Sequence, residues 1–169
     1  IKTDPDGNMV WDQTFDGGFG NGGFSSVHQT SDGGYILAGS TFSSEDLIYD
    51  AWLIKTDENG NMLWDQTFGG NDHDFVLSMQ QTSDGGYIFT GYTFSFGAGN
   101  TDAWLIKANA EGNMVWDQTF GGSSGDNAYS VKQTNDGGYI LVGETGSFGA
   151  YAWLIKTDAY GNAPATPTP

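Results

Sequence analysis

Four short apolar segments recur in the same order along the chain, with polar turns between them. In the first copy they read MVWDQTF, SSVHQT, GGYILAGST and AWLIKTD. Each has the length of a strand, is rich in β-branched or aromatic residues, and is bounded by Gly, Asn, Asp or Ser. Apolar positions do not recur at helical spacing. The pattern therefore predicts an all-β protein.

Two of these segments are apolar on both faces. In GGYILAGST, Tyr35 and Leu37 lie on one face while Ile36 and Ala38 lie on the other, because side chains alternate along a strand. The AWLIK segment alternates in the same way. A strand that is apolar on both faces has to be covered on both, which is typical of the inner strands of stacked sheets.

The segments repeat with a period of about fifty residues, which is the length of a propeller blade. We therefore predict three repeats of four antiparallel strands, at about residues 1–53, 54–105 and 106–162, arranged as β-propeller blades. A β-trefoil is the alternative, although a small barrel usually buries one face of its strands. The copies of WDQTF begin at Trp11, Trp64 and Trp116, and those of AWLIK at Ala51, Ala103 and Ala152.

The turns between the strands are as regular as the strands themselves. QTSDGG at residues 29–34 and 81–86, and QTNDGG at 133–138, place Asp or Asn beside paired glycines, which is the chemistry of a tight hairpin. The Thr-x-Asp-x-Gly spacing also matches the Asp-box of sialidase-like propellers, a structural motif. Sialidase chemistry needs an arginine cluster for the substrate carboxylate, and this chain has no Arg.

The most complete copy runs from Ser78 to Gly122 and follows SxxQTxDGGYIxxGxTxSxGxGxxDAWLIKxxxxGNxxWDQTFGG. It resembles the repeats of β-propeller proteins that archaea and bacteria secrete or display on the cell surface. The resemblance covers residues 1–162 and implies a propeller fold and an extracellular or cell-surface location. It implies no single activity.

The first and last repeats predict an exchange of strands. The last AWLIKTD segment is followed by APATPTP, a Pro/Thr-rich tail or linker at residues 163–169, rather than by WDQTF. We expect Met9–Phe15 to complete this last blade, within the chain or from a neighbouring copy. Since propellers typically have about four to eight blades, we expect a homo-oligomer or polymer, such as a six-bladed ring of two chains, or else a slice of a longer array.

Composition excludes several classes of partner. Twenty-one acidic residues stand against five Lys, giving a net charge of −16. Such a surface repels nucleic acid and anionic membranes. No apolar run is long enough to enter a bilayer, and the chain has no Cys for disulfides or thiolate catalysis.

The candidate metal ligands are Asp74 and Asp126, which lie four positions before Ser78 and Ser130, while the first copy has Gly22 there. Each carboxylate could bind Ca²⁺ together with backbone carbonyls, or could cap a turn. No other cofactor is expected.

Three further sets of residues have a structural interpretation beside the functional one. Asp72, His73 and Asp74 could offer oxygen and nitrogen ligands, but they belong to a single loop. His28 fits an ordinary strand position. The Asp that precedes AWLIK at positions 50 and 102 is Tyr at position 151, so a site built on it would be incomplete in one repeat.

The chain contains no serine elbow, phosphate-binding loop or catalytic triad pattern, and no carboxylate breaks the repeat in an apolar setting. We therefore predict a non-enzymatic extracellular module for structure or adhesion, with a glycan or cell-surface partner. The alternative is a carbohydrate-binding or carbohydrate-cleaving propeller with its site at the ring centre or on an exposed aromatic loop; a trefoil lectin is a third reading. In the propeller all six Trp are expected to be largely buried.

Overall fold

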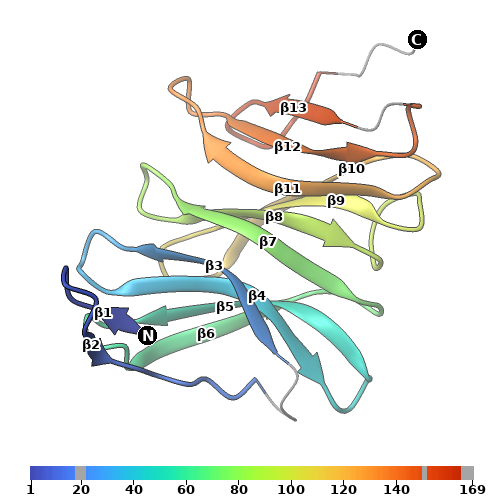
Figure 1. The fold of residues 1–169 in the computed structure, drawn as a ribbon. Coiled ribbons are helices and arrows are strands. Elements are labelled where there is room, and N and C mark those ends of the chain that lie inside the picture. The colour runs from blue at the N-terminus through green and yellow to red at the C-terminus, as the bar shows by residue number, and fades with distance from the viewer. Residues whose placement is uncertain (18–21, 150–151, 165–169) are drawn as a thin grey trace.

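A computed structural model describes residues 1–17, 22–149 and 152–164 of the chain. These residues form thirteen strands and no helix, so the predicted all-β class is confirmed. No helix in the described part of the chain is long and apolar enough to cross a membrane. All strand pairs are antiparallel, and they form four sheets (Figure 1).

Two sheets are complete, each with four strands in chain order. The first contains β3 (Gly23–Gln29), β4 (Tyr35–Ser43), β5 (Ile48–Thr56) and β6 (Met62–Phe68). The second contains β7 (Asp74–Gln81), β8 (Tyr87–Thr93), β9 (Asp102–Ala108) and β10 (Met114–Phe120). Each sheet therefore takes its last strand from the WDQTF segment that opens the following repeat.

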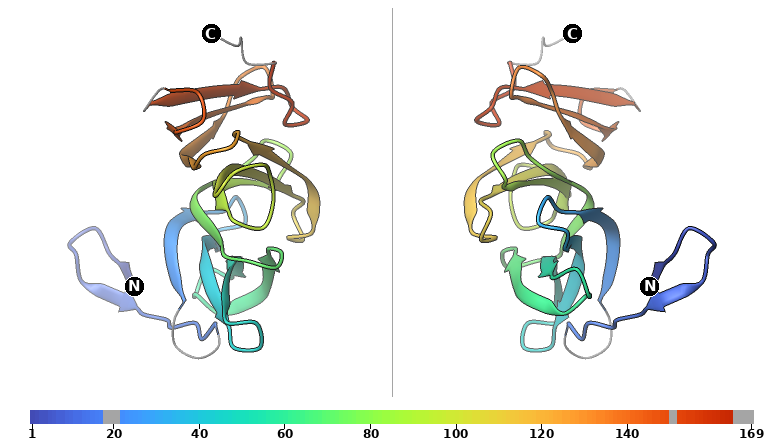
Figure 2. Two further views of the ribbon diagram at one scale, coloured as in Figure 1. Left: turned by 90° about the vertical axis from the view of Figure 1, so that its right-hand side faces the viewer. Right: turned by 90° about the vertical axis from the view of Figure 1, so that its left-hand side faces the viewer.

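The other two sheets are partial copies of this unit. The third sheet has only β11 (Asp126–Gln133), β12 (Tyr139–Thr145) and β13 (Trp153–Thr157). A two-stranded hairpin of β1 (Lys2–Thr3) and β2 (Met9–Trp11) projects to the side of the first sheet (Figure 2). The hairpin and β13 lie at opposite ends of the molecule (Figure 1). Of the predicted tail, residues 165–169 fall outside the described residues.

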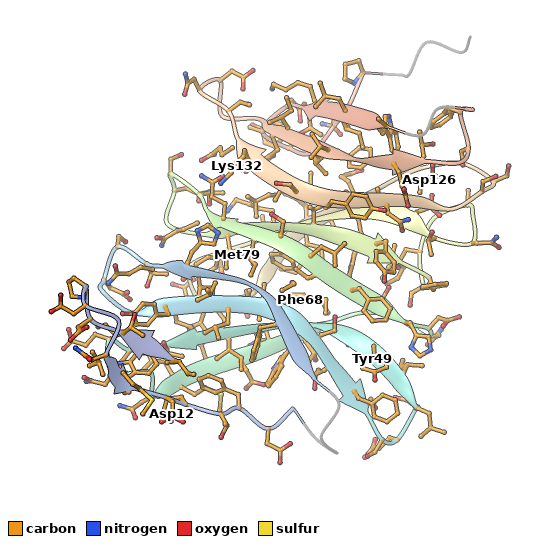
Figure 3. All side chains as sticks on the ribbon, viewed as in Figure 1. Asp12, Tyr49, Phe68, Met79, Asp126 and Lys132 are labelled. Carbon is orange, nitrogen blue, oxygen red and sulfur yellow. The ribbon has the colours of Figure 1, made fainter. Side chains whose placement is uncertain are left out.

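The three larger sheets stack face to face with an apolar core in each of the two interfaces. Between the first and second sheets, Ala38 and Leu53 belong to one buried cluster with Val76 and Met79. Figure 3 shows Phe68 in this layer, where its ring lies 5.2 Å from that of Phe89. The second interface contains Ile88, Ala103, Leu105, Ala128, Val131, Tyr139, Leu141 and Ile155.

The two complete sheets also share one strand register. Leu53 faces Gln66 across β5 and β6, and Leu105 faces Gln118 across β9 and β10. The register shifts close to the turn in both pairs. Equal sequence at equal spacing thus produces the same sheet twice.

The six Trp fall into two environments. Trp52 and Trp104 are only 4% and 2% exposed, and their indole nitrogens donate to Asp65 and Asp117 at 3.0 and 2.9 Å. The prediction of burial is confirmed for these two. The other four, Trp11, Trp64, Trp116 and Trp153, are half-buried, and all of them except Trp11 pack against one of the two core clusters. All four lie on the outermost strand of a sheet, where neighbours cover only part of the ring.

Candidate functional site

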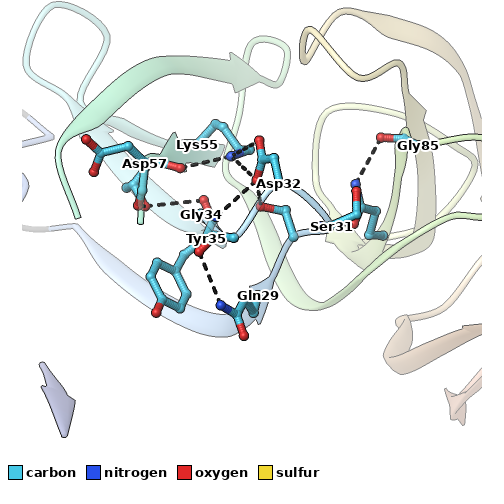
Figure 4. A network of polar contacts seen from close by, with 12 residues as sticks. Gln29, Ser31, Asp32, Gly34, Tyr35, Lys55, Asp57 and Gly85 are labelled. Atoms are coloured by element: carbon cyan, nitrogen blue, oxygen red, sulfur yellow. Dashed lines mark hydrogen bonds and ion pairs between the residues drawn. The ribbon is translucent and has the colours of Figure 1, made fainter. Parts of the chain in front are cut away.

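The DGG turns form one polar network that recurs in all three larger sheets. In the first copy, Lys55 reaches from β5 to Asp32 with Nζ 2.9 Å from Oδ2, and also donates to the Thr56 carbonyl at 2.9 Å (Figure 4). Thr30 Oγ1 and the Gly34 amide donate to the same carboxylate at 2.6 and 3.0 Å. Equivalent ion pairs join Lys107 to Asp84 at 3.0 Å and Lys156 to Asp136 at 2.8 Å.

These contacts lower the pKa of the turn carboxylates. The hydrogen bond from Thr30, followed by those from Lys55 and Gly34, lowers the pKa of Asp32 to about 2. Burial alone would raise the pKa of Asp84, but the bonds from Thr82 and its other partners outweigh burial and lower it to about 2. A group that stays ionised and fully engaged is a scaffold residue rather than a proton donor.

Two pairs of aspartates lie where one sheet passes to the next. A Cβ placed on Gly69 would lie 2.0 Å from Oδ1 of Asp50 and 2.9 Å from Oδ2 of Asp74, so a larger residue would displace these carboxylates. In the same way, Gly121 lies against Asp102 and Asp126. The structure therefore brings close together Asp residues that lie more than twenty positions apart in the sequence.

The two pairs differ in how fully their oxygens are used. Asp74 accepts hydrogen bonds at Oδ2 from the Gly70 amide and from Ser95 Oγ, at 2.9 and 2.7 Å. Its Oδ1 and that of Asp50 are buried and have no hydrogen-bond partner among the described residues. Burial, then the charges of Asp74 and Asp46, raise the pKa of Asp50.

The second pair is better satisfied. Asp126 accepts hydrogen bonds from the Gly122 amide at 3.1 Å and from Ser147 Oγ. Oδ2 of Asp102 accepts from the amides of Ala98 and Gly99 at 3.0 and 2.9 Å. Asp74 and Asp126 thus both cap turns, as one of the two interpretations of the sequence expects.

Calcium at Asp74 and Asp126 stays a prediction. Ca²⁺ takes about six to eight oxygen ligands, and the free carboxylate oxygens at the Asp50–Asp74 pair could supply two of them. Within residues 1–17, 22–149 and 152–164, no cluster of three or more His, Cys, Asp or Glu is arranged to hold a metal ion. The Asp50–Asp74 pair therefore has two buried carboxylate oxygens without a hydrogen-bond partner, and the Asp102–Asp126 pair has none among the described residues.

The two histidines have ordinary contacts. His73 accepts a hydrogen bond at Nδ1 from the Tyr49 amide at 3.0 Å. Asp72, its neighbour, accepts one from the His73 amide at 2.8 Å. His28 lies on β3, and burial, followed by the charge of Lys132, lowers its pKa.

An aromatic strip that sequence reasoning missed crosses the first and second sheets at one edge of the molecule, where Figure 3 labels Tyr49. The Tyr49 and Phe75 rings are stacked with centroids 5.6 Å apart, and Tyr92 follows Phe75 at 5.1 Å. Phe94, at the end of the strip, is 44% exposed. The strip consists of Phe42, Tyr49, Phe75, Tyr92 and Phe94.

The strip breaks the repeat. In the third sheet, the positions of Phe75 and Tyr92 hold Asn127 and Glu144. Tyr49, Phe75 and Tyr92 have no aromatic equivalent in the other copies, and this departure was the available signal in the sequence. Such a departure is not required by the repeated core.

A groove of about 690 Å³ lies between the N-terminal segment and the first sheet. Trp11 and Phe15 line one side of it, and Phe24, Val27 and Leu37 line the other. The wall of the groove is mostly apolar. The residues that line the first sheet's side, Phe24, Val27 and Leu37, occupy the repeat positions at which the second sheet has the core residues Val76, Met79 and Phe89.

No protein-family model matches the chain, and no curated protein sequence is similar to it. The fold and the repeated contacts define a protein built from repeated antiparallel β-sheets.

Proposed function

We propose that the chain is a β-propeller module of the cell exterior that serves structure or adhesion and catalyses no reaction. One observation carries the proposal: two four-stranded antiparallel sheets and a three-stranded one stack through equivalent apolar interfaces. This arrangement provides a rigid surface with equivalent faces, which suits repeated contact better than asymmetric chemistry.

The strand order favours a propeller over a trefoil. In a propeller each blade is a sheet of four consecutive antiparallel strands, and the blades pack face to face. The orders β3-β4-β5-β6 and β10-β9-β8-β7 match that plan. A trefoil would instead combine strands of different repeats in one barrel.

The carboxylates support the non-catalytic reading. Asp32, Asp84 and Asp136 are held by lysines and turn donors, and Asp126 is held by a turn as well. A general acid needs a raised pKa beside an open reaction site. Asp50 has a raised pKa, but its free oxygen is buried in a sheet junction.

Carbohydrate binding is the second candidate, and the aromatic strip favours it. Exposed apolar patches that polar groups border often mark interaction sites. The strip contains Tyr49 and Tyr92, whose rings combine an apolar face with a hydroxyl group. A neutral glycan would also avoid the repulsion that the net charge of −16 imposes on anionic ligands.

A glycan array and a hydrolase screen test the two candidates. Binding that Tyr92→Ala removes, and that Tyr160→Ala preserves, would support the glycan site, because Tyr160 is an exposed tyrosine outside the strip. Turnover that one carboxylate substitution abolishes would overturn the non-enzymatic proposal. Antibody labelling of intact source cells tests the location, and labelling only after lysis would contradict it.

A further inference from the structure

We propose that the aromatic strip, together with the exposed carboxylates beside it, binds a lysine- or arginine-rich segment of a partner protein. Such a partner serves the proposed adhesion role, on which the inference rests. Three features of the molecule lead to it: an edge without cations, a continuous row of rings, and carboxylates at both ends of that row. We call this edge, which carries the strip and the exposed side chains of Glu45, Asp46, Asp72 and Glu144, the acidic edge.

All five lysines of the chain lie at the opposite edge, beside the DGG turns. They are Lys2, Lys55, Lys107, Lys132 and Lys156. Lys107, for example, faces Ile88 at the start of β8, whereas Tyr92 lies near the end of that strand. Figure 3 likewise shows Lys132 on the far side of the stack from Tyr49.

The lysine charges are too distant to neutralise the acidic edge. The step from Ile88 to Tyr92 spans about 13 Å, because a strand rises about 3.3 Å per residue. Exposed charges farther apart than the Debye length, about 8 Å at physiological salt, are largely screened from each other. Three of the lysines are also paired with turn aspartates. Since the chain has no Arg, the acidic edge holds negative charge without a compensating Lys or Arg.

The carboxyl group of Asp50 responds to this negative charge. Burial, followed by the charges of Asp74 and Asp46, raises its pKa. Both charges belong to the acidic edge, since Asp74 begins β7 and Asp46 lies in the turn between β4 and β5. A cationic group is therefore attracted to this edge, and an anionic group is repelled.

The rings of the strip supply surface for cationic side chains. Neighbouring ring centroids are 5.1, 5.6 and 5.1 Å apart along the row of Phe42, Tyr49, Phe75 and Tyr92. Aromatic faces attract ammonium and guanidinium groups within about 6 Å, and the methylene stems of Lys and Arg cover apolar surface. Side chains on one face of an extended peptide recur about every 7 Å, so several of them can lie along the row.

Exposed carboxylates border the first part of the row. Glu45 and Asp46 lie in the turn between β4 and β5, the two strands at which the row begins. Asp72 is adjacent to His73, whose ring lies 5.7 Å from that of Tyr49. A charged group that leaves the rings at this end therefore meets carboxylates.

Glu144 borders the other end of the row, next to Tyr129. It occupies in the third sheet the position that Tyr92 holds in the second. The hydrogen bond from Tyr129 lowers the pKa of Glu144, so this carboxylate is ionised at neutral pH. The same hydrogen bond and, to a smaller extent, the nearby Tyr92 raise the pKa of Tyr129. Tyr129 is 46% exposed and extends the aromatic surface from Tyr92 toward Glu144.

The pairing of rings with carboxylates favours a cationic chain over a neutral glycan at this edge. A neutral glycan would stack on the rings but would gain nothing from the charge of the edge. A lysine or arginine side chain uses both, because its stem packs on a ring while its charge reaches a carboxylate. A single small amine would contact one part of the row, whereas a chain with several charged side chains reaches both ends.

The test uses hexalysine, with hexalysine acetylated on every side chain as the neutral control. Isothermal titration calorimetry of the native chain should detect hexalysine binding. Acetylation should weaken binding at least about tenfold, because it removes the charges and keeps the stems. Equal binding of the two peptides, or no binding of hexalysine, would overturn the proposal. Binding of neutral oligosaccharides in place of hexalysine would assign the strip to the glycan candidate instead.

Ring substitutions test the strip with residues that the other copies carry at the same positions. Phe75→Asn takes its residue from Asn127, and Tyr92→Ser takes its residue from Ser40, so the repeated sheet accommodates both. The double variant should weaken hexalysine binding about two- to fivefold. Tyr160→Ala is the control and should leave the affinity unchanged, since Tyr160 is 73% exposed and lies outside the acidic edge. Equal losses in the two variants would refute the role of the strip.

Carboxylate substitutions test the acidic edge without altering the packing of the rings. Asp72→Asn with Glu144→Gln removes two exposed charges from it, and Glu58→Gln with Glu111→Gln removes two from the opposite edge. The first pair should weaken hexalysine binding about threefold, and the second pair should weaken it less than half as much. Equal losses would mean that hexalysine follows net charge alone, which would contradict a localised site.

The outcomes for the partner and for the proposed function can be told apart. Hexalysine that fails to bind a chain without hydrolase activity would refute the cationic partner but not the structural module. Turnover in the hydrolase screen would refute the non-enzymatic role but not the binding of a cationic segment.

Discussion

The lysine of the turn motif is buried in the first two sheets and partly exposed in the third. Lys55 and Lys107 have side chains only 6% and 7% exposed, whereas the Lys156 side chain is 42% exposed. A buried ammonium depends on its partner because water cannot replace the lost contact. The same Asp should therefore contribute more to stability in the first two sheets than in the third.

Substituting Asp84 with Asn should reduce the free energy of unfolding at pH 7 by about 1 to 2 kcal/mol, through loss of a charge-assisted contact to Lys107. Asp136→Asn is the matched control and should cost less, because Lys156 keeps access to water. Urea denaturation of both variants measures the difference. Equal losses would contradict the role of lysine burial.

The pH dependence of this stabilisation follows from the lowered pKa. Asp84 has a pKa of about 2 in the folded protein, against an ordinary value of 3.8 for an aspartate. Its stabilisation is present above the unfolded value and is lost as the pH falls from there toward about 2. Asp84→Asn should therefore differ from the native protein at pH 7 and approach it below pH 3.

Asp50 should behave in the opposite way. Its pKa is raised, so folding favours its protonated form, and the native state loses stability as the pH rises above the unfolded pKa and through the folded one. Asp50→Asn should raise the unfolding temperature at pH 7. Asp102→Asn should lower it, since that carboxylate accepts two backbone hydrogen bonds. If Ca²⁺ raised the unfolding temperature of the native protein but not that of Asp50→Asn, a cation bridging Asp50 and Asp74 would be indicated instead.

At the scale of the element, β9 and β13 are near-identical strands with unequal surroundings. Both contain WLIK, but β9 lies between β8 and β10, whereas β13 has β12 on one side only. An outer strand hydrogen-bonds along one edge and leaves the other as a template for association. The cost of losing one side chain should therefore depend on the strand's position in the sheet.

Trp104→Ala should cost about 3 to 5 kcal/mol, because the indole is 2% exposed and its loss leaves a cavity beside Asp117. Trp153→Ala should cost less than half as much, because that indole is only half-buried. Chemical denaturation measures both. Similar costs would contradict the dependence on the strand's position in the sheet.

Local patterns in the sequence predicted the strands and the hairpin turns, because alternation, glycine pairs and Asp caps act over a few residues. Contacts between different sheets could not be predicted in this way. Nothing in the chain order shows that Asp50 meets Asp74, or that Tyr49 stacks on Phe75, since these contacts depend on how two sheets pack. Likewise, Leu154 and Leu53 have identical neighbours in sequence, and only the stacking of sheets explains their different exposure.

At the scale of the whole molecule, the net charge of −16 destabilises the folded state through repulsion between like charges. Dissolved salt screens this repulsion. The unfolding temperature should therefore rise between about 0.05 and about 0.5 M NaCl. Thermal unfolding at both salt concentrations measures the change, and a lower unfolding temperature at high salt would indicate that the ion pairs of the turns outweigh the repulsion.

The identity of Met9–Phe15 and Met114–Phe120 also matters during folding. During folding, β9 can pair with either of two segments of the same sequence, Met114–Phe120 of its own sheet or Met9–Phe15 near the N-terminus. The pairing energy is equal for the two. Met114–Phe120 is favoured because it is closer along the chain, and the shorter loop closes at a lower entropic cost. Crowded refolding should weaken that preference and trap chains with strands borrowed from the wrong neighbour, so recovery of native protein should decline as its concentration rises.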